Sequence, residues 1–311
     1  MARGATLYVS LEPCSSAGRV GPCTEAVKAA GVRRVVYAAP DANPANAGRA
    51  EAVLREAGVE VRGGVLRAEA ECMLEPFFKF IRTGRPFVTL KMAQSLDGAI
   101  ADHAGASKWI TGPEARDEVA RMRRRADVVM VGSGTILADD PSLMRRSEPE
   151  GGLPGMRCAL DARCRIGSSA KIFSDGHAER TIVATARDAS PERVREWERL
   201  GAAAWRIAPA LPQAAAGGAA RPLSLPALME KFGREGFMHV LCEGGAALAS
   251  ALVSEGLVDE LRLFVAPVVL GRPSLGVFGS IAHDLPTAPR FGIISERRFG
   301  EDILLVMRPK P

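Results

Sequence analysis

The sequence has few aromatic residues and no long hydrophobic run. Only 5% of its 311 residues are Phe, Trp or Tyr, and the formal net charge is a modest +5. Such a charge suits an anionic small molecule, but basic residues interleaved with stacking aromatics, as in nucleic-acid-binding surfaces, are missing. No run approaches the roughly 18 apolar residues that cross a bilayer, and the first residues form a strand pattern instead of a secretory signal. We therefore expect a cytoplasmic protein with neither a nucleic acid nor a membrane as partner.

Histidine is scarce, and the cysteines show no disulfide framework. The four histidines are widely spaced and receive no role: His103, His177, His239 and His283. Among the six cysteines, only Cys14 and Cys23 lie close together in the sequence, each directly after a proline. In a reducing compartment such a pair holds a metal ion more often than it forms a disulfide. The pair therefore indicates half of a metal site.

What the sequence does contain is a regular alternation of strand and helix patterns. The first patterns alternate as strand, helix, strand, helix and strand: residues 6–10, 22–30, 33–40, 50–58 and 59–64. This order predicts parallel strands joined by crossover helices. One long helix is expected over residues 66–84, and a new strand pattern starts behind it. The length allows two domains, and we place them at residues 1–80 and 86–311, with a linker at 81–85.

The C-terminal part repeats this alternation. A basic helix at residues 113–126 precedes an apolar strand, and a later strand at residues 237–245 runs into a glycine turn. The last two strand patterns, residues 291–299 and 301–309, indicate a terminal hairpin. The low-complexity segment at residues 209–222 is expected to be a surface loop or a short disordered insertion. The whole chain is thus predicted to be α/β.

The cysteine pair lies in the motif LEPCSSAGRVGPC, which follows the first strand. A zinc deaminase activates water on a metal held by His or Cys together with two Cys, while a separate Glu moves protons. A strand, a turn and the start of a helix would bring Cys14 and Cys23 together as two such ligands. The stretch from GATLYVSLEPC to DANPANAGR resembles the second half of the deaminase domain of the bifunctional riboflavin biosynthesis deaminase/reductase family.

The resemblance also implies residues that this sequence does not show. The family carries a His ligand and the proton-transferring Glu on a helix before the first strand found here, and a histidine is usual where Ser15 and Ser16 stand. We therefore expect Cys14 and Cys23 to form an incomplete metal site, with zinc as its candidate ion, in part of a cytidine-deaminase-like three-layer domain. A missing amino-terminal segment and a genuine loss of activity both explain this pattern. Glu12, on the strand side of the turn, is expected to make a structural or substrate-edge contact.

From Pro86 onward the chain resembles the reductase domain of the same family, which has a dihydrofolate-reductase-like α/β fold. The resemblance rests on four motifs in order: VTLKMAQSLDGAIA, the stretch from SKWITG to ILADDPSL, the stretch from LCEGG to VAPVVLG, and DILLVM. It implies a role in riboflavin biosynthesis, the NADPH-dependent reduction of 5-amino-6-(5-phosphoribosylamino)uracil to the ribitylamino product. It also implies a phosphorylated pyrimidine as substrate and a homodimer.

The resemblance assigns roles to residues within these motifs. Lys91 and Glu243 are implied to be catalytic; the alternatives are a lysine that extends from the sheet edge into water and a carboxylate that caps a helix. The implied substrate-binding residues are Ser107, Arg123, Leu143, Arg146 and Glu243, with Arg123 and Arg146 as ligands of the substrate phosphate. The implied cofactor-binding residues are Ala93, Trp109, Thr135, Asp139, Gly244, Gly245 and Ala246.

Two glycine-containing stretches give these cofactor assignments a physical basis. GSGTILADDP predicts a glycine-rich turn whose N–H groups can approach phosphate, although glycines after strands are commonly just turns. Gly244 and Gly245 directly follow a buried strand and open a helix, and the N-terminus of that helix would attract a pyrophosphate. The pattern is not GxGxxG, so a Rossmann dinucleotide site is not indicated.

Three other interpretations stay open at this point. The chain could be a zinc hydrolase acting on the preceding pyrimidine, if a further segment supplies the His and Glu. It could be a noncatalytic binding protein that uses residues 1–80 as a dimer surface. It could also be a dihydrofolate-type reductase, although the LEPC…GPC motif argues against this. The choice of NADPH over NADH follows from the resemblance alone, because no residue in the sequence can be identified as a ligand of the 2′-phosphate of NADPH.

Overall fold

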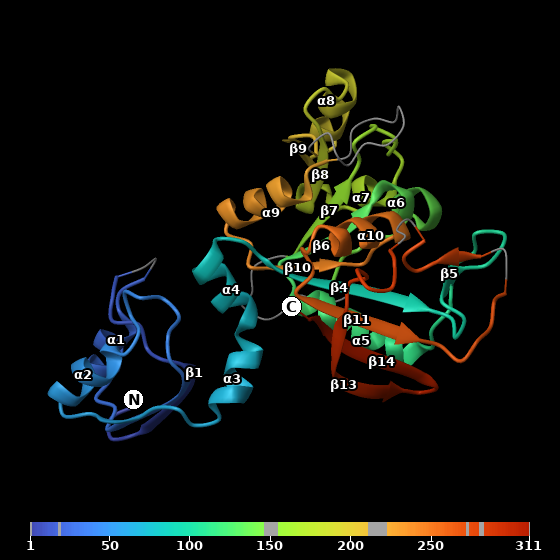
Figure 1. Cartoon of the computed structure of the whole chain (residues 1–311). Helices are drawn as coiled ribbons and strands as arrows, with labels where there is room; N and C mark the ends of the chain where they lie inside the picture. Colours follow the sequence, from blue (N-terminus) through green and yellow to red (C-terminus); the bar gives the residue numbers. More distant parts are fainter. Residues whose placement is uncertain are drawn as a thin grey trace. The chain divides into compact units, whose positions relative to one another are not determined.

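The computed structural model describes residues 2–17, 20–145, 155–210, 223–271, 274–279 and 283–310. The chain forms two compact units, Met1–Arg85 and Pro86–Pro311, and both are built from strands and helices, so the α/β prediction is confirmed (Figure 1). Arg146 and most of the low-complexity segment lie outside the described residues. Within the described part of the chain, no helix is both long and apolar enough to cross a membrane.

The N-terminal unit contains a parallel sheet of three described strands in the order β1-β2-β3. Its elements are β1 Thr6–Leu11, α1 Cys23–Ala29, β2 Arg34–Ala39, α2 Arg49–Glu56, β3 Glu60–Arg62, α3 Arg67–Met73 and α4 Glu75–Thr83. Val35, Tyr37 and Leu54 are buried in one cluster between this sheet and its crossover helices. The predicted strand-helix alternation of this part is therefore confirmed.

The single helix expected over residues 66–84 is wrong, because the structure has two helices there. α3 ends at Met73 and α4 begins at Glu75, with Leu74 between them at φ −98° and ψ 7°. Pro76 lies in the first turn of α4, where its missing N–H needs no partner. Inside one continuous helix the same proline would remove a hydrogen bond and clash with the preceding turn. The proline therefore starts a second helix.

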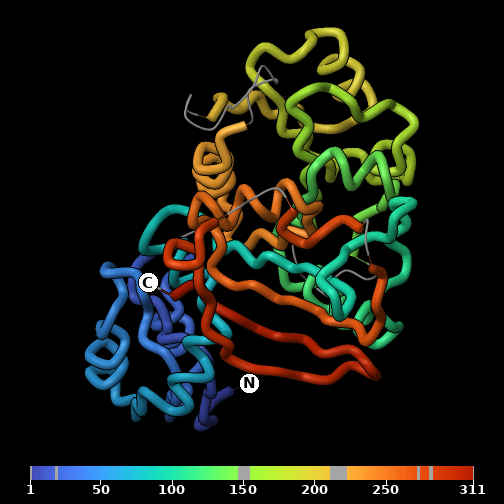
Figure 2. Tube along the Cα trace, turned by 45° about the vertical axis from the view of Figure 1, so that its right-hand side comes forward, coloured from blue at the N-terminus to red at the C-terminus, as the bar shows by residue number. Residues whose placement is uncertain are grey.

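In the described part of the C-terminal unit, the main sheet has nine strands in the order β13-β14-β11-β4-β10-β6-β7-β8-β9. The bounds are β4 Phe87–Gln94, β6 Val128–Gly132, β7 Met156–Leu160, β8 Thr181–Ala186, β9 Ala203–Ile207, β10 His239–Cys242, β11 Glu260–Val265, β13 Phe291–Phe299 and β14 Asp302–Pro309. The strands from β11 to β9 run parallel. β13 and β14 form the predicted antiparallel hairpin, which pairs with β11 (Figure 2).

Helices cover both faces of this sheet. They are α5 Pro113–Arg125, α6 Ser133–Asp139, α7 Lys171–Ser174, α8 Pro191–Arg199, α9 Leu225–Arg234 and α10 Ala246–Ser254. Alternate residues of β6 serve the two faces: Val128 and Met130 pack with residues of α9 and α10, whereas Val129 and Val131 pack with residues of α6, α7 and α8. Burial of both faces explains why the parallel strands read as continuous apolar runs. Two short strands, β5 Ala99–Ala101 and β12 Leu275–Gly276, pair separately.

Candidate active site

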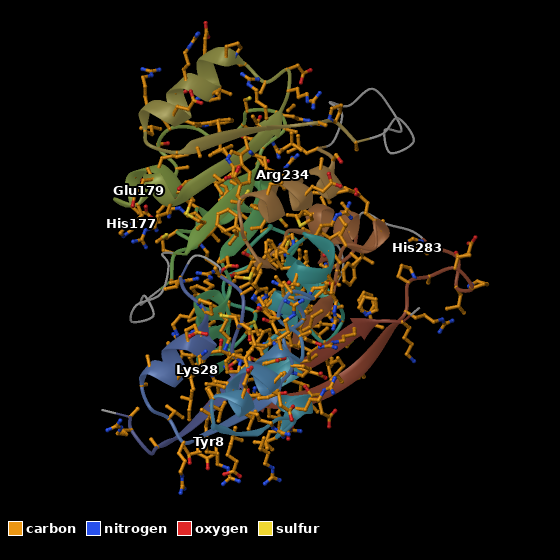
Figure 3. The ribbon with its side chains drawn as sticks, turned by 90° about the vertical axis from the view of Figure 1, so that its left-hand side faces the viewer. Tyr8, Lys28, His177, Glu179, Arg234 and His283 are labelled. Carbon is orange, nitrogen blue, oxygen red and sulfur yellow. The ribbon has the colours of Figure 1, made fainter. Side chains whose placement is uncertain are left out.

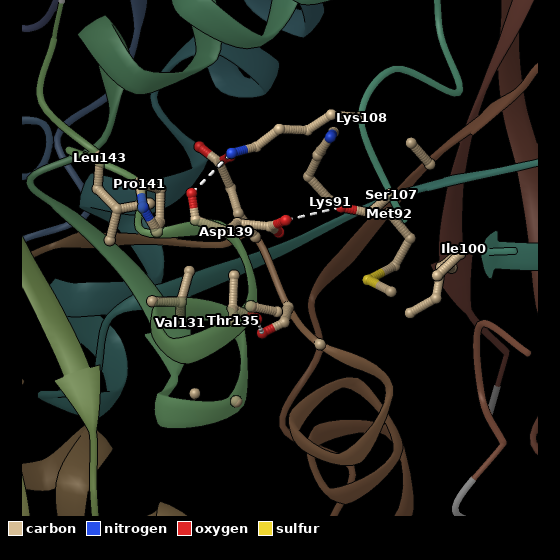
Figure 4. Close-up of a pocket in the computed structure, with 18 of the residues that line it drawn as sticks. Lys91, Met92, Ile100, Ser107, Lys108, Val131, Thr135, Asp139, Pro141 and Leu143 are labelled. Atoms are coloured by element: carbon tan, nitrogen blue, oxygen red, sulfur yellow. Dashed lines mark hydrogen bonds between the residues drawn. The ribbon is translucent and has the colours of Figure 1, made fainter. Parts of the chain in front are cut away.

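A cavity of about 880 Å³ opens in the C-terminal unit, around the carboxyl ends of β4, β6 and β10 (Figure 4). In open parallel sheets this edge is where ligands bind. The cavity is lined by every described residue to which the resemblance assigns a reductase role: Lys91, Ala93, Ser107, Trp109, Arg123, Thr135, Asp139, Leu143, Glu243, Gly244, Gly245 and Ala246. Residues from five separate stretches of the sequence thus meet in one place, whereas Arg146 lies outside the described residues.

An arginine–carboxylate pair forms the charged centre of the cavity. Arg123, on α5, donates two hydrogen bonds to Glu243, which directly follows β10: Nε to Oε1 at 2.5 Å and Nη2 to Oε2 at 2.8 Å. Both side chains are largely shielded, with 24% of Arg123 and 9% of Glu243 exposed. Burial alone would raise the pKa of Glu243, but Arg123 and the nearby Lys91 outweigh it and hold this pKa below its usual value. Glu243 is therefore a carboxylate and not a neutral acid.

Lys91 belongs to the same electrostatic cluster. It lies on β4, and its ammonium group stands 5.7 Å from the centre of the Phe264 ring. Burial lowers the pKa of Lys91, and Glu243 only partly opposes this effect. A lowered pKa makes an ammonium group a better proton donor near neutral pH. Lys91 thus lines the cavity and is not a lysine that simply extends into water.

Two lining residues with different implied roles bind one another. Ser107, in the loop after β5, donates its hydroxyl to Asp139 Oδ1 at 2.7 Å, and Lys108 Nζ donates to the Asp139 carbonyl at 2.6 Å (Figure 4). The two bonds join the loop after β5 to the end of α6. Lys108 is a cavity residue to which the sequence motifs assigned no role, although it lies directly between Ser107 and Trp109.

Trp109 is a surface residue and not part of the core. Its side chain is 69% exposed, and the Arg116 guanidinium stacks at 4.7 Å from its ring centre. Arg116 is itself held by a hydrogen bond from Nη1 to the Thr111 carbonyl at 2.6 Å. A large aromatic face therefore stands beside the cavity, where a flat ring of a ligand can contact it.

Gly244 and Gly245 form a backbone cradle before α10. Both have positive φ angles, +78° and +86°, a conformation that L-residues with side chains rarely adopt. A Cβ on Gly244 would lie 2.8 Å from Met92 Sδ, and one on Gly245 would lie 2.9 Å from Thr135 Oγ1. α10 has no side-chain N-cap, so its first N–H groups remain available to an anion. The prediction of a helix that opens with these glycines is confirmed.

The glycine-rich turn expected at GSGTILADDP is wrong in its local structure. Ser133–Asp139 forms helix α6 directly after β6. No proline interrupts this stretch, and Ile136 is buried against the sheet, so packing stabilises a helix over a turn. Thr135 lies in this helix, and its hydroxyl donates to the Gly244 carbonyl at 3.1 Å. The residue thus reaches the cradle from a helix and not from a loop.

The loop after α6 forms one wall of the cavity. Leu143 has a φ of +61°, and its side chain is buried in the cluster beneath the wall. Leu143 also lines the cavity. Ser142 supports the same loop by donating its hydroxyl to Asp175 Oδ2 at 2.7 Å.

A buried arginine that the sequence motifs did not single out holds this loop. Arg157, on β7, is completely buried. It donates Nη1 to the Ser142 carbonyl at 2.7 Å and Nη2 to the Ile172 carbonyl at 2.6 Å, and it pairs with both carboxylate oxygens of Asp175, at 2.5 and 2.8 Å. These hydrogen bonds hold the pKa of Asp175 well below its usual range. Arg157 thereby fixes the cavity wall to the start of α7.

In the N-terminal unit, the structure brings Cys14 and Cys23 together. Their Sγ atoms are 3.2 Å apart, and the Cys23 N–H donates to Cys14 Sγ at 3.3 Å. The contact with Cys14 raises the pKa of the Cys23 thiol. Among the described residues, no group of three His, Cys, Asp or Glu side chains is arranged to hold a metal ion.

Glu12 has a structural role, one of the two expected for it. Its carboxylate is 2% exposed and accepts hydrogen bonds from the backbone N–H groups of Asp41, Gly48 and Ala50, at 3.1, 3.0 and 3.1 Å. The oxygens are therefore occupied by the long turn between β2 and α2. They are not directed to a proton-transfer reaction at the cysteines.

The histidines of the C-terminal unit lie apart. Figure 3 shows His177 and His283 on opposite sides of this unit, with His177 next to Glu179 at the surface. His239 contacts the Thr89 hydroxyl at 2.9 Å. None of these positions lines the cavity among the residues described around it.

Comparison with known proteins gives consistent matches over the whole chain. The model of the RibD C-terminal domain family matches residues 86–305. The riboflavin biosynthesis protein RibD of Bacillus amyloliquefaciens is 36% identical over 313 residues, which cover 100% of this chain and 81% of that protein. The form 1 structure of Acinetobacter baumannii RibD is 35% identical, with a TM-score of 0.84, over 100% of this chain and 82% of that one.

A second solved structure agrees. The diaminohydroxyphosphoribosylaminopyrimidine deaminase/5-amino-6-(5-phosphoribosylamino)uracil reductase of Thermotoga maritima is 31% identical. It superimposes with a TM-score of 0.80, covering 99% of this chain and 80% of that one. The similarity therefore includes the strands and helices of both units, and it is not confined to the cavity motifs.

Proposed function

Because the chain belongs to the RibD family of riboflavin biosynthesis proteins, we propose that it reduces 5-amino-6-(5-phosphoribosylamino)uracil to the ribitylamino product with NADPH. The observation that carries the proposal is the single cavity of the C-terminal unit. It combines a glycine cradle for cofactor phosphates with the charged cluster of Lys91, Arg123 and Glu243. A cofactor and a polar substrate can therefore meet at the carboxyl edge of the sheet.

The residues around the cradle fit a dinucleotide. At both glycines of the cradle, an added Cβ would collide with a neighbouring side chain. Their bare backbone and the uncapped start of α10 suit a pyrophosphate. Ala93 and Ala246 line the cavity with small side chains, and the exposed Trp109 offers a ring face. NADPH supplies a hydride when bound. The protein's own contribution is to hold the substrate in position and to exclude competing reactions.

The charged cluster supplies the proton that the reaction needs. When the bond between C1 of the ribose and its ring oxygen opens, C1 accepts a hydride and the oxygen accepts a proton. We assign this proton to Lys91 Nζ, whose pKa is lowered by burial. Glu243 keeps Lys91 protonated to a higher pH than burial alone would allow, and Arg123 holds Glu243 in place through two hydrogen bonds.

This proposal is tested by the nicotinamide absorbance of purified protein supplied with substrate and NADPH. The wild type should oxidise NADPH only when the phosphoribosylaminouracil is present. Lys91→Met should lower kcat by about 10²- to 10⁴-fold, the usual effect of removing a general acid, while the affinity for NADPH stays unchanged. Substrate-dependent oxidation that is equally fast in the variant would exclude Lys91 as the proton donor.

The finer fold and domain assignments belong to the same proposal. We assign residues 1–80 to part of a cytidine-deaminase-like three-layer domain, residues 81–85, which include the end of α4, to a linker, and residues 86–311 to a dihydrofolate-reductase-like domain. The parallel order β1-β2-β3 and the contact between Cys14 and Cys23 support the first assignment. The two thiols match two of the three ligands that a deaminase zinc needs, but the described residues do not supply the third.

The alternative function is therefore conditional. A bifunctional enzyme that also deaminates the diaminopyrimidine precursor requires a His ligand and a proton-transferring Glu from a further segment. The juxtaposed thiols favour this candidate over an unrelated N-terminal function. Zinc binding by the intact protein, measured by elemental analysis with a Cys14→Ser control, distinguishes a metal-holding pair from an inert one.

Cellular location and assembly complete the proposal. We place the enzyme in the cytoplasm, in agreement with its free cysteines, and we propose a homodimer. Exposed Ile293 and Ile294 on the edge strand β13 support self-association. Light scattering combined with size-exclusion chromatography tests the assembly: a monomer at all concentrations would contradict it.

A further inference from the structure

The charged side chains that line the cavity differ in how many polar contacts they already make within the protein. They comprise Lys91, Lys108, Arg116, Arg123, Lys171, Asp139, Asp140 and Glu243. Arg123 directs its fork to Glu243, Lys108 binds the Asp139 carbonyl, and Arg116 is held by Thr111 and Trp109. A phosphorylated substrate brings a dianion into this cavity and needs a cation that is not already committed.

Lys171 is such a cation. It is the first residue of α7, its side chain is exposed, and it lines the cavity. In the part of the chain that the structure describes, its ammonium group makes no ion pair and no hydrogen bond. The charge is therefore available to a ligand without breaking an interaction among the described residues.

The backbone of Lys171 is fixed, although its ammonium group has no polar partner among the described residues. Its N–H donates to Asp140 Oδ1 at 2.8 Å. The carbonyl of the next residue, Ile172, accepts from Arg157 Nη2 at 2.6 Å and from Thr181 Oγ1 at 2.9 Å, and the Ile172 side chain is buried. The backbone at Lys171 is thus held on both sides, so less conformational freedom is lost when the side chain binds a ligand.

The same contacts place Lys171 at the wall formed by the loop after α6. Arg157 bonds to the Ser142 carbonyl as well as to Ile172, so that loop and α7 are joined by one buried side chain. Leu143, which the family resemblance implies to be a substrate-binding residue, belongs to this wall. The carboxylate of Asp140 lies nearby, but one of its oxygens is occupied by the Lys171 N–H.

We propose that Lys171 binds the phosphate group of the substrate. This inference rests on the proposed function and adds a residue that the sequence motifs did not contain. The family resemblance implies Arg123 as a phosphate ligand. In our proposal the Arg123 guanidinium instead orients Glu243, and Lys171 supplies the cation for the phosphate. Both contacts lie in one cavity, so the phosphate and the reacting carbon of a single substrate can be held at once.

The test compares Lys171→Ala and Lys171→Arg with the wild type in steady-state kinetics. Loss of one charge-assisted hydrogen bond to phosphate should raise the KM of Lys171→Ala for the phosphorylated substrate by about tenfold. Its kcat and its KM for NADPH should stay unchanged, and Lys171→Arg should largely restore binding. With the dephosphorylated substrate, Lys171→Ala and the wild type should have the same KM.

Lys231→Ala is the matched control. Lys231, on α9, pairs with Glu235 and lies over the ring of Trp205, and it is not among the residues described around the cavity. The control removes the same charge, so a general effect of net charge on substrate binding would appear in both alanine variants. The proposal requires an effect in Lys171→Ala alone.

Other results would overturn the inference. A raised KM for NADPH instead of substrate would mean that Lys171 contacts a cofactor phosphate, and equal losses with both substrates would mean a structural role. Calorimetric titration of ribose 5-phosphate into both proteins decides the question if the wild type does not turn over, because it needs no catalysis. Inactivity of the wild type contradicts the proposed function, whereas equal ribose 5-phosphate affinity in the wild type and Lys171→Ala contradicts the role of Lys171.

Discussion

Arg157→Met tests whether the cavity wall depends on one buried ion pair. The substitution keeps an unbranched side chain but removes every hydrogen bond that Arg157 donates, including the two to Asp175. Asp175 is 15% exposed and would lose its cation. Breaking a buried ion pair in this way costs about 3–5 kcal/mol of stability. Three carbonyls, those of Ser142, Ile172 and His177, also lose a donor, so the upper part of this range is expected.

Urea unfolding of the full chain measures this change. Combining Arg157→Met with Asp175→Asn should cost less than the sum of the two single changes, with a coupling of about 1–3 kcal/mol. Arg206→Met is a suitable control, because Arg206 is exposed and, among the described residues, donates only to the carbonyls of Arg187 and Ala189. If the stability costs of Arg157→Met and Asp175→Asn simply add in the double variant, Arg157 and Asp175 do not act as a unit and the reasoning is refuted.

The pH dependence of stability gives an independent check. The pKa of Asp175 is lower in the folded protein than in the unfolded chain, mainly because of its hydrogen bonds with Arg157. The stabilisation is therefore present above the pKa of an unfolded aspartate, about 3.9, and is lost as the pH falls toward the folded value. Arg157→Met should lose less stability than the wild type over this acid range.

Three further predictions concern catalysis. Glu243→Gln removes the carboxylate that raises the pKa of Lys91, so the alkaline limb of the pH profile of kcat should move to lower pH. An unchanged alkaline limb would show that Glu243 does not influence the pKa of the proton donor. Gly245→Ala should raise the KM for NADPH and leave the substrate KM unchanged, because its Cβ would meet Thr135 Oγ1 at 2.9 Å and its φ is +86°; wild-type cofactor binding would contradict the cradle. The chain with the sequence shown should release no ammonia from the diaminopyrimidine precursor, with or without zinc; steady release would show a ligand set that the cysteine pair does not indicate.

Much of the cavity follows from motifs that are local in the sequence. Gly244 and Gly245 lie between a buried strand and a helix, and that order alone predicts a cradle at the edge of a sheet. Lys91 lies on a buried strand, and its position toward the cavity follows from strand geometry. These predictions needed no knowledge of the strand order.

The contacts between distant residues could not be predicted in the same way. Arg123 and Glu243 are separated by 120 positions, and their pairing depends on the placement of α5 beside β10. Arg157 lies in the short strand MRCAL, where an arginine looks like an ordinary polar position. Its burial becomes evident only when Asp175 is brought beneath it. The position of Lys171 beside the cavity likewise depends on a contact between distant residues, because its N–H donates to Asp140, 31 positions away.

In the proposed reaction, a hydride passes from NADPH to the ribose carbon of the pyrimidine substrate in the cavity of the C-terminal unit. The most direct measurement uses NADPH carrying deuterium at the transferable position and locates the label in the product by nuclear magnetic resonance. We expect one deuterium at C1 of the ribityl chain, with loss of this product in Lys91→Met. NADPH oxidation that leaves no deuterium in the product, or no substrate-dependent oxidation by the folded wild type, would contradict this reaction.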